Sequence, residues 1–181
     1  MKRLLSLVAA AALMLSAVFA TAEGVTFSTK YFSVELPEGW LIDTDDLEKE
    51  EGEECLGFFG SPEEVGMACG TYLVYYEDLK DFALWNASKE ELEEYKEILM
   101  EEFEDGSPEL IDIVTADKIP LVVIRVHDED GDFIYADTMT NGYAIQFEFY
   151  VTDEGGEKLY PITDEHIEQV KTILATFKPA A

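Results

Sequence analysis

Two segments of the chain alternate apolar and polar residues with the two-residue period of a half-buried β-strand, 31–36 and 143–151. Phe32, Val34 and Leu36 share one face of the first strand, and four apolar side chains share one face of the second. Other runs rich in β-forming residues predict further strands over 40–42, 71–76, 111–114, 119–127 and 133–139. The tight-turn pair Asn141-Gly142 predicts that consecutive strands form hairpins.

Two other segments carry apolar residues at helical spacing. The first begins at a capping box, Ser88 to Glu91, and the second begins at Thr163. Their apolar stripes are Leu92, Tyr95, Leu99 and Phe103 in the first, and Ile167, Val170, Leu174 and Phe177 in the second. The acidic stretch 44–52 predicts a third, short helix capped by Thr44. Together these elements predict an antiparallel meander whose apolar faces are covered by helices, which is an α+β fold.

The chain begins with the three parts of a secretory signal peptide. Met1-Lys2-Arg3 is positively charged, 4–19 is uncharged and mostly apolar, and Ala20-Thr21-Ala22 supplies small residues for cleavage. The alternative is an uncleaved membrane anchor, because 4–22 is almost long enough to span a bilayer. We expect cleavage after Ala22, which leaves 23–181 as a single globular domain, secreted or in the periplasm or cell envelope and not inserted in a membrane.

The composition is strongly acidic. The chain has 40 Asp and Glu residues against 12 Lys and Arg, a formal net charge of −28, and removal of Lys2 and Arg3 makes the remainder more negative. Such a domain is repelled by nucleic acids and by anionic lipid surfaces. The acidic residues either form a solvated surface or attract cations or a basic protein.

Cys55 and Cys69 are the two cysteines of the chain. Outside the cytoplasm two thiols at this separation are expected to form a disulfide, which would close a loop of about fifteen residues; the alternative is two buried thiols. Phe58 and Phe59 lie between the cysteines in a glycine-rich segment, and Trp85 precedes the capped helix. These aromatic residues either form an exposed partner-binding loop or pack beneath the disulfide.

Candidate metal ligands lie in one turn. Asp128, Asp130 and Asp132 surround Gly131 and offer the oxygen ligands that calcium accepts. The turn departs from the EF-hand pattern, because Met139 stands where the bidentate Glu is required, and a simple hairpin turn explains the same residues.

The two histidines are His127 and His166. His127 follows a predicted strand, where a base, a metal ligand or a surface residue could lie, and His166 is expected to face solvent in the first turn of the last helix. Nucleophile, zinc-protease and phosphate-loop motifs are absent from the sequence, so we expect neither an enzyme nor a cofactor.

Three segments resemble the PsbP/DcrB-like family. They are the opening phrase Phe32 to Trp40, the hairpin end Gly142-Tyr143-Ala144-Ile145, and the closing helix Ile167 to Phe177. The resemblance implies an α/β/α sandwich around a twisted, mainly antiparallel sheet. Members include extrinsic photosystem proteins and bacterial envelope proteins and share no catalytic motif. This chain lacks the acylated Cys of lipid-anchored members, and the segment 55–69 has no counterpart in the family pattern.

These observations favour a non-enzymatic, acidic, extracytoplasmic domain that binds or supports a protein partner. The alternatives are a calcium- or cation-binding secreted domain and a hydrolase whose site is assembled from scattered residues.

Overall fold

The computed structural model describes residues 24–45, 47, 49–50, 52–128, 131–153, 156 and 158–180. The predicted signal peptide, 1–22, lies outside the described residues, as does Asp130 of the predicted calcium turn. Within the described residues, no helix has the length and apolar character needed to cross a membrane.

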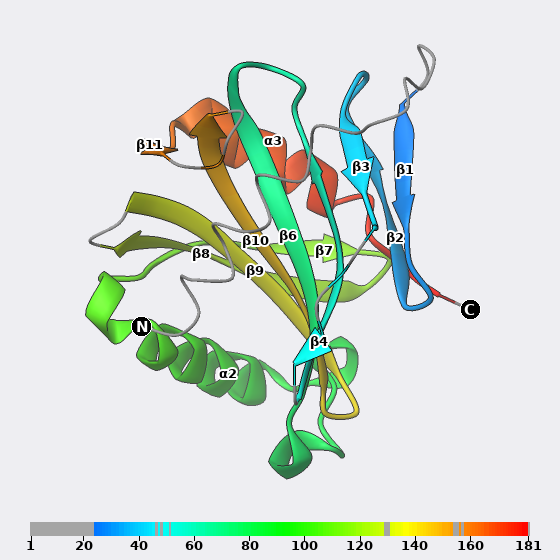
Figure 1. The fold of residues 1–181 in the computed structure, drawn as a ribbon. Coiled ribbons are helices and arrows are strands. Elements are labelled where there is room, and N and C mark those ends of the chain that lie inside the picture. The colour runs from blue at the N-terminus through cyan, green and yellow to red at the C-terminus, as the bar shows by residue number, and fades with distance from the viewer. Residues whose placement is uncertain are drawn as a thin grey trace.

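Most of the strands form one antiparallel sheet of nine strands, the main sheet, in the order β3-β5-β6-β10-β9-β8-β7, with β11 beside β10 and β4 beside β5 (Figure 1). The strands are β3 (Leu41–Asp43), β4 (Lys49–Glu50), β5 (Glu53–Gly60), β6 (Val65–Tyr75), β7 (Glu109–Ala116), β8 (Ile119–Asp128), β9 (Gly131–Thr140), β10 (Tyr143–Asp153) and β11 (Leu159–Tyr160). The predicted meander is therefore present from β7 to β10. The β5–β6 hairpin joins its edge, because β6 pairs with β10.

The turn between β9 and β10 sets the register of this meander. Asn141 and Gly142 both have positive φ, 51° and 79°, which is the backbone of a two-residue hairpin turn. Thr140 and Tyr143 consequently pair across the turn, and the register continues to Ile134 opposite Phe149.

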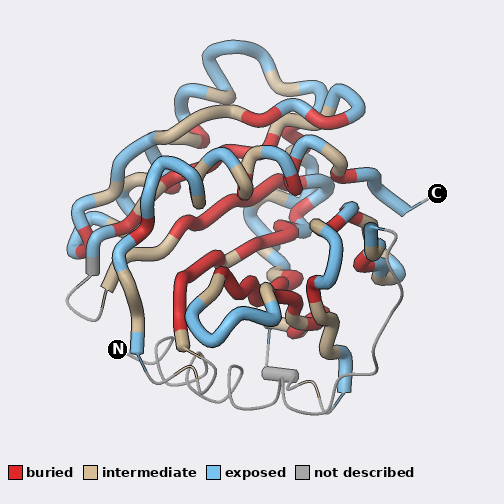
Figure 2. Tube along the Cα trace, turned by 90° about the horizontal axis from the view of Figure 1, so that it is seen from above, coloured by how far each residue is buried: buried red, intermediate tan, exposed pale blue. Residues whose placement is uncertain are grey.

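A three-stranded sheet of β1 (Val25–Ser28), β2 (Phe32–Leu36) and β12 (Lys178–Pro179) packs against one face of the main sheet. The same face is covered by α3 (Asp164–Leu174), and the opposite face by α2 (Lys89–Glu102). We call these the α3 face and the α2 face. Buried residues fill the interior between these layers in Figure 2, and the helix on each face confirms the predicted α/β/α arrangement.

The alternation in the sequence accounts for the larger core. Phe32, Val34 and Leu36 of β2 are buried on the α3 face, as predicted. The inward residues of β10 meet them there: Ile145, Phe147, Phe149 and Val151. Phe32 makes ring contacts with Phe147 and Phe177 at 5.1 and 5.5 Å between centroids, so the two sheets and the segment after α3 share one aromatic core.

Both predicted helix starts carry reciprocal caps. In α2, Glu91 N–H donates to Ser88 Oγ at 3.2 Å while Ser88 N–H donates to Glu91 Oε2 at 2.7 Å. In α3, Thr163 Oγ1 accepts from the His166 N–H, and His166 Nδ1 accepts from the Thr163 N–H at 3.2 Å. His166 is therefore half-buried in a cap rather than simply facing solvent.

Two predictions of local structure are wrong. Residues 49–50, within the predicted short helix, form strand β4 against β5. The glycine-rich segment between the cysteines is largely the β5–β6 hairpin rather than a loop. Two of its glycines are needed because aromatic side chains pack against the backbone there, and not because the chain turns. A Cβ on Gly57 would lie 2.9 Å from the Phe27 ring, and one on Gly70 would lie 2.6 Å from the Tyr72 hydroxyl.

The predicted disulfide between Cys55 and Cys69 is not formed in the structure. Cys55 pairs with Tyr72, whereas Cys69 pairs with Phe59. Cys69 and Tyr72 are three positions apart on β6 and so point to opposite faces of the sheet, which places Cys55 on the face away from Cys69. The two cysteines are also displaced from one another by about 10 Å along the strands, which is more than a disulfide can span.

Candidate functional site

A cavity of about 550 Å³ opens at one end of the α3 face. The main sheet supplies one wall, through β6, β8, β9 and β10, and the end of the chain supplies another. Its described lining residues are Tyr31, Leu73, Trp85, Ile119, Thr138, Met139, Thr140, Tyr143, Ile145, Phe177, Pro179 and Ala180. We call it the uncharged pocket, because none of these residues is charged although 29% of the whole chain is.

The floor of the uncharged pocket is continuous with the core. Leu73, Ile145 and Phe177 line the pocket and also belong to the large apolar cluster of the α3 face. The core therefore does not close at this end of the sheet, and apolar surface reaches the outside there.

Exposed aromatic side chains lie at the rim of the pocket and beside it: Trp85 and Tyr143 line the pocket, and Tyr75 contacts Tyr143. Trp85 is 60% exposed, Tyr143 45% and Tyr75 41%, and the rings of Tyr75 and Tyr143 lie 4.8 Å apart. We call these three residues the aromatic surface. Large aromatic groups left this exposed at the mouth of a pocket are typical of binding surfaces.

The hairpin turn holds Trp85 in place. Trp85 lies in the 3₁₀ turn η3 (Leu84–Asn86), just before the capping box of α2. Ala83 forms a β-bridge with Thr140, and the Asn141 N–H donates to the Phe82 carbonyl at 2.8 Å. These bonds dock the segment before α2 against the β9–β10 turn, which brings Trp85 and Tyr143 to the same pocket.

Thr138 is the polar residue buried deepest in this lining. Its side chain is 4% exposed, and Oγ1 has no hydrogen-bond partner. Thr138 pairs with Ile145 in the β9–β10 ladder, so both side chains lie on the α3 face and line the pocket, although Oγ1 of Thr138 is itself buried away from the open space. A buried hydroxyl without a partner is costly, and such groups are rare in folded proteins.

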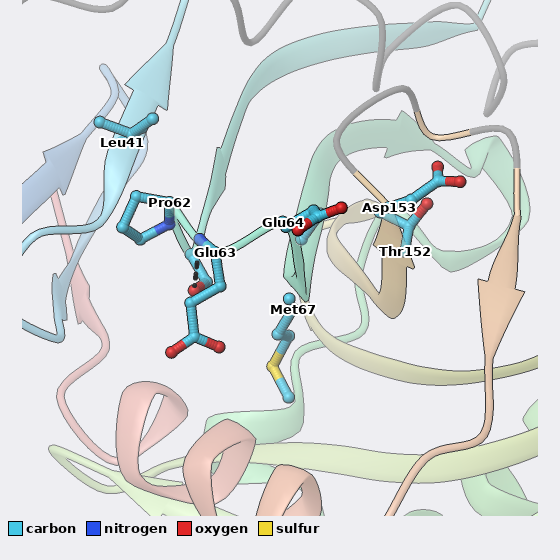
Figure 3. Close-up of a pocket in the computed structure, with 10 residues that line it drawn as sticks. Leu41, Pro62, Glu63, Glu64, Met67, Thr152 and Asp153 are labelled. Carbon is cyan, nitrogen blue, oxygen red and sulfur yellow. Dashed lines mark hydrogen bonds between the residues drawn. The ribbon is translucent and has the colours of Figure 1, made fainter.

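A second pocket, of about 320 Å³, lies at the opposite end of β6 and β10 (Figure 3). Leu41 and Met67 supply apolar surface, and Glu63, Glu64 and Asp153 are acidic. In Figure 3 the carboxylates of Glu63 and Asp153 point away from one another, and the described residues contain no group of acidic, His or Cys side chains arranged to hold a metal ion.

Beneath α2 the structure buries a carboxyl group that the sequence reasoning missed. Asp137 of β9 is buried on the α2 face, and the Tyr95 hydroxyl of α2 donates to its Oδ1 at 2.6 Å. Burial is the main cause that raises the pKa of Asp137 to about 7, with a contribution from the nearby Glu102 and against the opposing hydrogen bond from Tyr95. The signal in the sequence is an Asp within the predicted strand 133–139, whose other residues are apolar or aromatic apart from Thr138.

The predicted calcium turn contains an ion pair. Asp132 Oδ2 pairs with Arg125, and Asp132 Oδ1 lies 2.9 Å from Nδ1 of His127. Burial by itself would raise the pKa of Asp132, but the hydrogen bonds from Arg125 and His127 hold that pKa below its ordinary value. Calcium binding at Asp128, Asp130 and Asp132 stays a prediction, because the side chains of Asp128 and Asp130 lie outside the described part of the structure.

The three aromatic residues of the predicted binding loop are not equivalent. Phe59 is fully buried and contacts the rings of Trp40 and Phe149, while Phe58 is half-buried with its ring edge-on to Tyr72. Trp85 alone of the three is exposed, and it belongs to the uncharged pocket. Neither of the two pockets is lined by His127 or His166.

Comparison with models of protein families and with curated proteins found no match. Among solved structures, the chain matches the solution structure of cyanobacterial PsbP (CyanoP) from Synechocystis sp. PCC 6803, with 14% identity and a TM-score of 0.49 over 91% of this chain and 98% of that one. The fold resembles PsbP. A crystal structure from Bacteroides thetaiotaomicron VPI-5482 matches with 17% identity and a TM-score of 0.45. This match covers 87% of the present chain but only about half (49%) of the other. Both TM-scores lie below 0.5, so the functional argument rests on the site.

Proposed function

We propose that this protein is a non-catalytic, extracytoplasmic domain that binds a protein partner through the aromatic surface. The observation that carries the proposal is that Trp85 and Tyr143 line the pocket and Tyr75 contacts the ring of Tyr143, while each of the three is more than a third exposed. Trp and Tyr supply a large share of binding energy at protein interfaces, because their rings bury much area at a small cost in conformational entropy.

Charge around the aromatic surface favours a basic partner. Tyr75 donates a hydrogen bond to Glu77 at 2.7 Å, and the exposed Asp78 and Asp81 follow in the same segment. With a net charge of −28 for the whole chain, association is expected to be fastest with a partner that carries Lys and Arg around an apolar centre.

A capture experiment tests this proposal. The chain 23–181 is immobilised and exposed to the extracytoplasmic fraction of its source, and the captured protein is identified and its affinity measured. We expect Trp85→Ala to weaken binding roughly tenfold or more, because a central aromatic anchor is lost.

The matched control is Ile98→Ala, which removes an exposed apolar side chain from α2, 49% exposed and away from the pocket lining. This variant is expected to bind as the wild type does. Equal capture by the wild type and Trp85→Ala, or capture by neither, would contradict the proposal.

A further inference from the structure

We propose that the aromatic surface binds a proline-rich segment of the partner in the polyproline II conformation, with Lys or Arg beside the prolines. This inference rests on the proposed function, because it names the chemistry of the partner that the aromatic surface binds. It is carried by the exposed rings, by side chains at the rim that can donate hydrogen bonds, and by carboxylates beside Tyr75.

The exposed rings suit proline. The rings of Tyr75 and Tyr143 lie 4.8 Å apart and are tilted by 42°, and both residues keep more than a third of their surface open to solvent. Trp85 is 60% exposed and shares the pocket lining with Tyr143. Proline-rich segments bind to surfaces lined by such aromatic residues, because their extended backbone is preformed and loses little conformational entropy on binding.

The rim also offers donors to a main chain. The indole N–H of Trp85 and the O–H of Tyr143 form no hydrogen bond with the described residues, so both can donate to a ligand. A polyproline II segment has no internal hydrogen bonds, and its carbonyl groups accept from outside. Proline lacks an N–H, so such a segment needs few acceptors in return. An α-helix bonds its own carbonyl groups and would leave both donors unmet.

The described main chain at this surface offers no long edge to which a strand could be added. β6, β9 and β10 each lie between two neighbouring strands of the main sheet, and Ala83 bridges Thr140 at the end of β9. β12 is an edge strand, but it is two residues long and contains Pro179, which has no N–H to pair. Recognition here therefore depends on side chains, as it does in the binding of polyproline II segments.

Carboxylates beside Tyr75 favour basic residues next to the prolines. The Tyr75 O–H donates to Glu77 at 2.7 Å, and Asp78 and Asp81 are exposed in the same segment. Lys80 pairs with Glu77 at 3.4 Å, so the segment 77–81 holds three carboxylates against one ammonium group. The described lining of the uncharged pocket adds no charge. The Lys or Arg of the partner is therefore expected beside 77–81, with the prolines on the rings.

Three synthetic peptides separate the contribution of proline from that of charge. The first is a run of prolines that ends in a pair of arginines, the second has alanine in place of proline, and the third has aspartate in place of arginine. Each is titrated into the chain 23–181 while backbone amide and indole resonances are followed by NMR. We expect the proline–arginine peptide to shift Tyr75, Trp85 and Tyr143, and to bind roughly fivefold more tightly than either of the others.

Two conservative substitutions test the donors. Trp85→Phe keeps an aromatic ring and removes the indole N–H, and Tyr143→Phe removes the O–H. Each should weaken binding of the proline–arginine peptide roughly threefold or more, because a hydrogen bond to a peptide carbonyl is lost. The matched control is Tyr160→Phe, which removes a hydroxyl outside the pocket lining and should bind the peptide as the wild type does.

A pair of double substitutions tests the carboxylates. Asp78→Asn with Asp81→Asn should weaken binding of the proline–arginine peptide and leave the proline–aspartate peptide no weaker. Glu63→Gln with Glu64→Gln is the control, because it removes two exposed charges at the opposite end of β6 and β10. The control variant should retain more of the affinity than the first variant does, since the charges it loses lie farther from the peptide.

Three results would overturn the inference. The first is that the proline–arginine peptide shifts none of the aromatic surface up to its solubility limit. The second is that the alanine peptide binds as tightly, and the third is that both double substitutions weaken binding equally. Capture of a partner that is lost in Trp85→Ala, without any peptide binding, would contradict this inference and support the proposed function. Peptide binding without a captured partner would count against the proposed function alone.

Discussion

Asp137 is a carboxyl group buried under α2, and the described groups that shift its pKa include no positive charge. Its described neighbours that can titrate or donate hydrogen bonds come from four directions, namely Tyr95 and Glu102 of α2, Tyr135 of β9, Tyr76 after β6 and Gln146 of β10. Burial raises the pKa of Tyr95 and of Tyr135 as well, so both phenols stay neutral and can donate. The fold is nevertheless most stable with Asp137 protonated, because the cost of burying its charge outweighs the gain that the Tyr95 hydrogen bond gives to the ionised form.

The contribution of Asp137 to the stability of the fold should consequently fall as the pH rises from acidic to neutral. The folded-state pKa of Asp137, about 7, lies above its ordinary value of 3.8. Between these values the unfolded chain has released the proton while the folded chain retains it, so raising the pH favours unfolding. Above about pH 7 the full cost is present, roughly 4 kcal/mol for this separation of pKa values.

Asp137→Asn tests this dependence, because an amide keeps an acceptor for Tyr95 and cannot ionise. Urea unfolding of both proteins is measured at about pH 5 and at about pH 8. The variant should gain stability relative to the wild type at the higher pH by a few kcal/mol. A difference between the two proteins that is the same at both pH values would disprove the assignment.

At the scale of the element, the β5–β6 hairpin decides the state of the two cysteines. The register of this hairpin places Cys55 opposite Tyr72 and Cys69 opposite Phe59, on different faces of the main sheet. Cys69 is buried in the core of the α3 face, and its Sγ lies 3.3 Å from the Gly70 carbonyl. Burial raises the pKa of the Cys69 thiol well above its ordinary value, which suppresses the reactive thiolate.

We therefore expect the native chain 23–181 to retain two thiols, even when it is produced in an oxidising compartment. A thiol-specific reagent should react slowly with the folded protein and with two groups per chain after denaturation without reductant. Mass spectrometry after alkylation provides the count. Recovery of a single intramolecular disulfide would show that the register of β5 and β6 differs from the one described.

At the scale of the whole molecule, a large negative charge surrounds a fold in which the uncharged pocket opens at the end of the α3 face. Carboxylates are distributed along the acidic helix α2 and the turns, and their mutual repulsion opposes the compact state. Few cations offset it, since the chain has 12 Lys and Arg.

Salt should stabilise the protein for this reason. Raising NaCl from about 10 mM to about 300 mM shortens the screening length several-fold and weakens the repulsion. We expect the midpoint of thermal unfolding of the chain 23–181 to rise over this range, with most of the increase at low salt. Sucrose at equal osmolality is the control for effects unrelated to charge, and a midpoint that falls with salt would argue against dominant self-repulsion.

Local patterns in the sequence were sufficient for much of the fold. The alternation in 31–36 and 143–151, the Asn141-Gly142 turn and the cap at Ser88 depend on neighbours within a few residues, so each could be predicted without the tertiary structure. The prediction of a loop between Cys55 and Cys69 was wrong because the glycines of this segment accommodate the rings of Phe27 and Tyr72. Phe27 is far away in the sequence and reaches this segment only when the chain folds.

The candidate site shows even more clearly the difference between what local sequence patterns predict and what depends on the tertiary structure. The sequence by itself determined that the chain is acidic, that strands precede the last helix, and that Trp85 stands just before a capped helix. Only the tertiary structure decided that Trp85, Thr138, Tyr143 and Phe177 line one pocket, because they come from a 3₁₀ turn, two strands and the segment after α3. No local periodicity relates such residues. Their meeting follows from the order of strands in the sheet and from which face each helix covers.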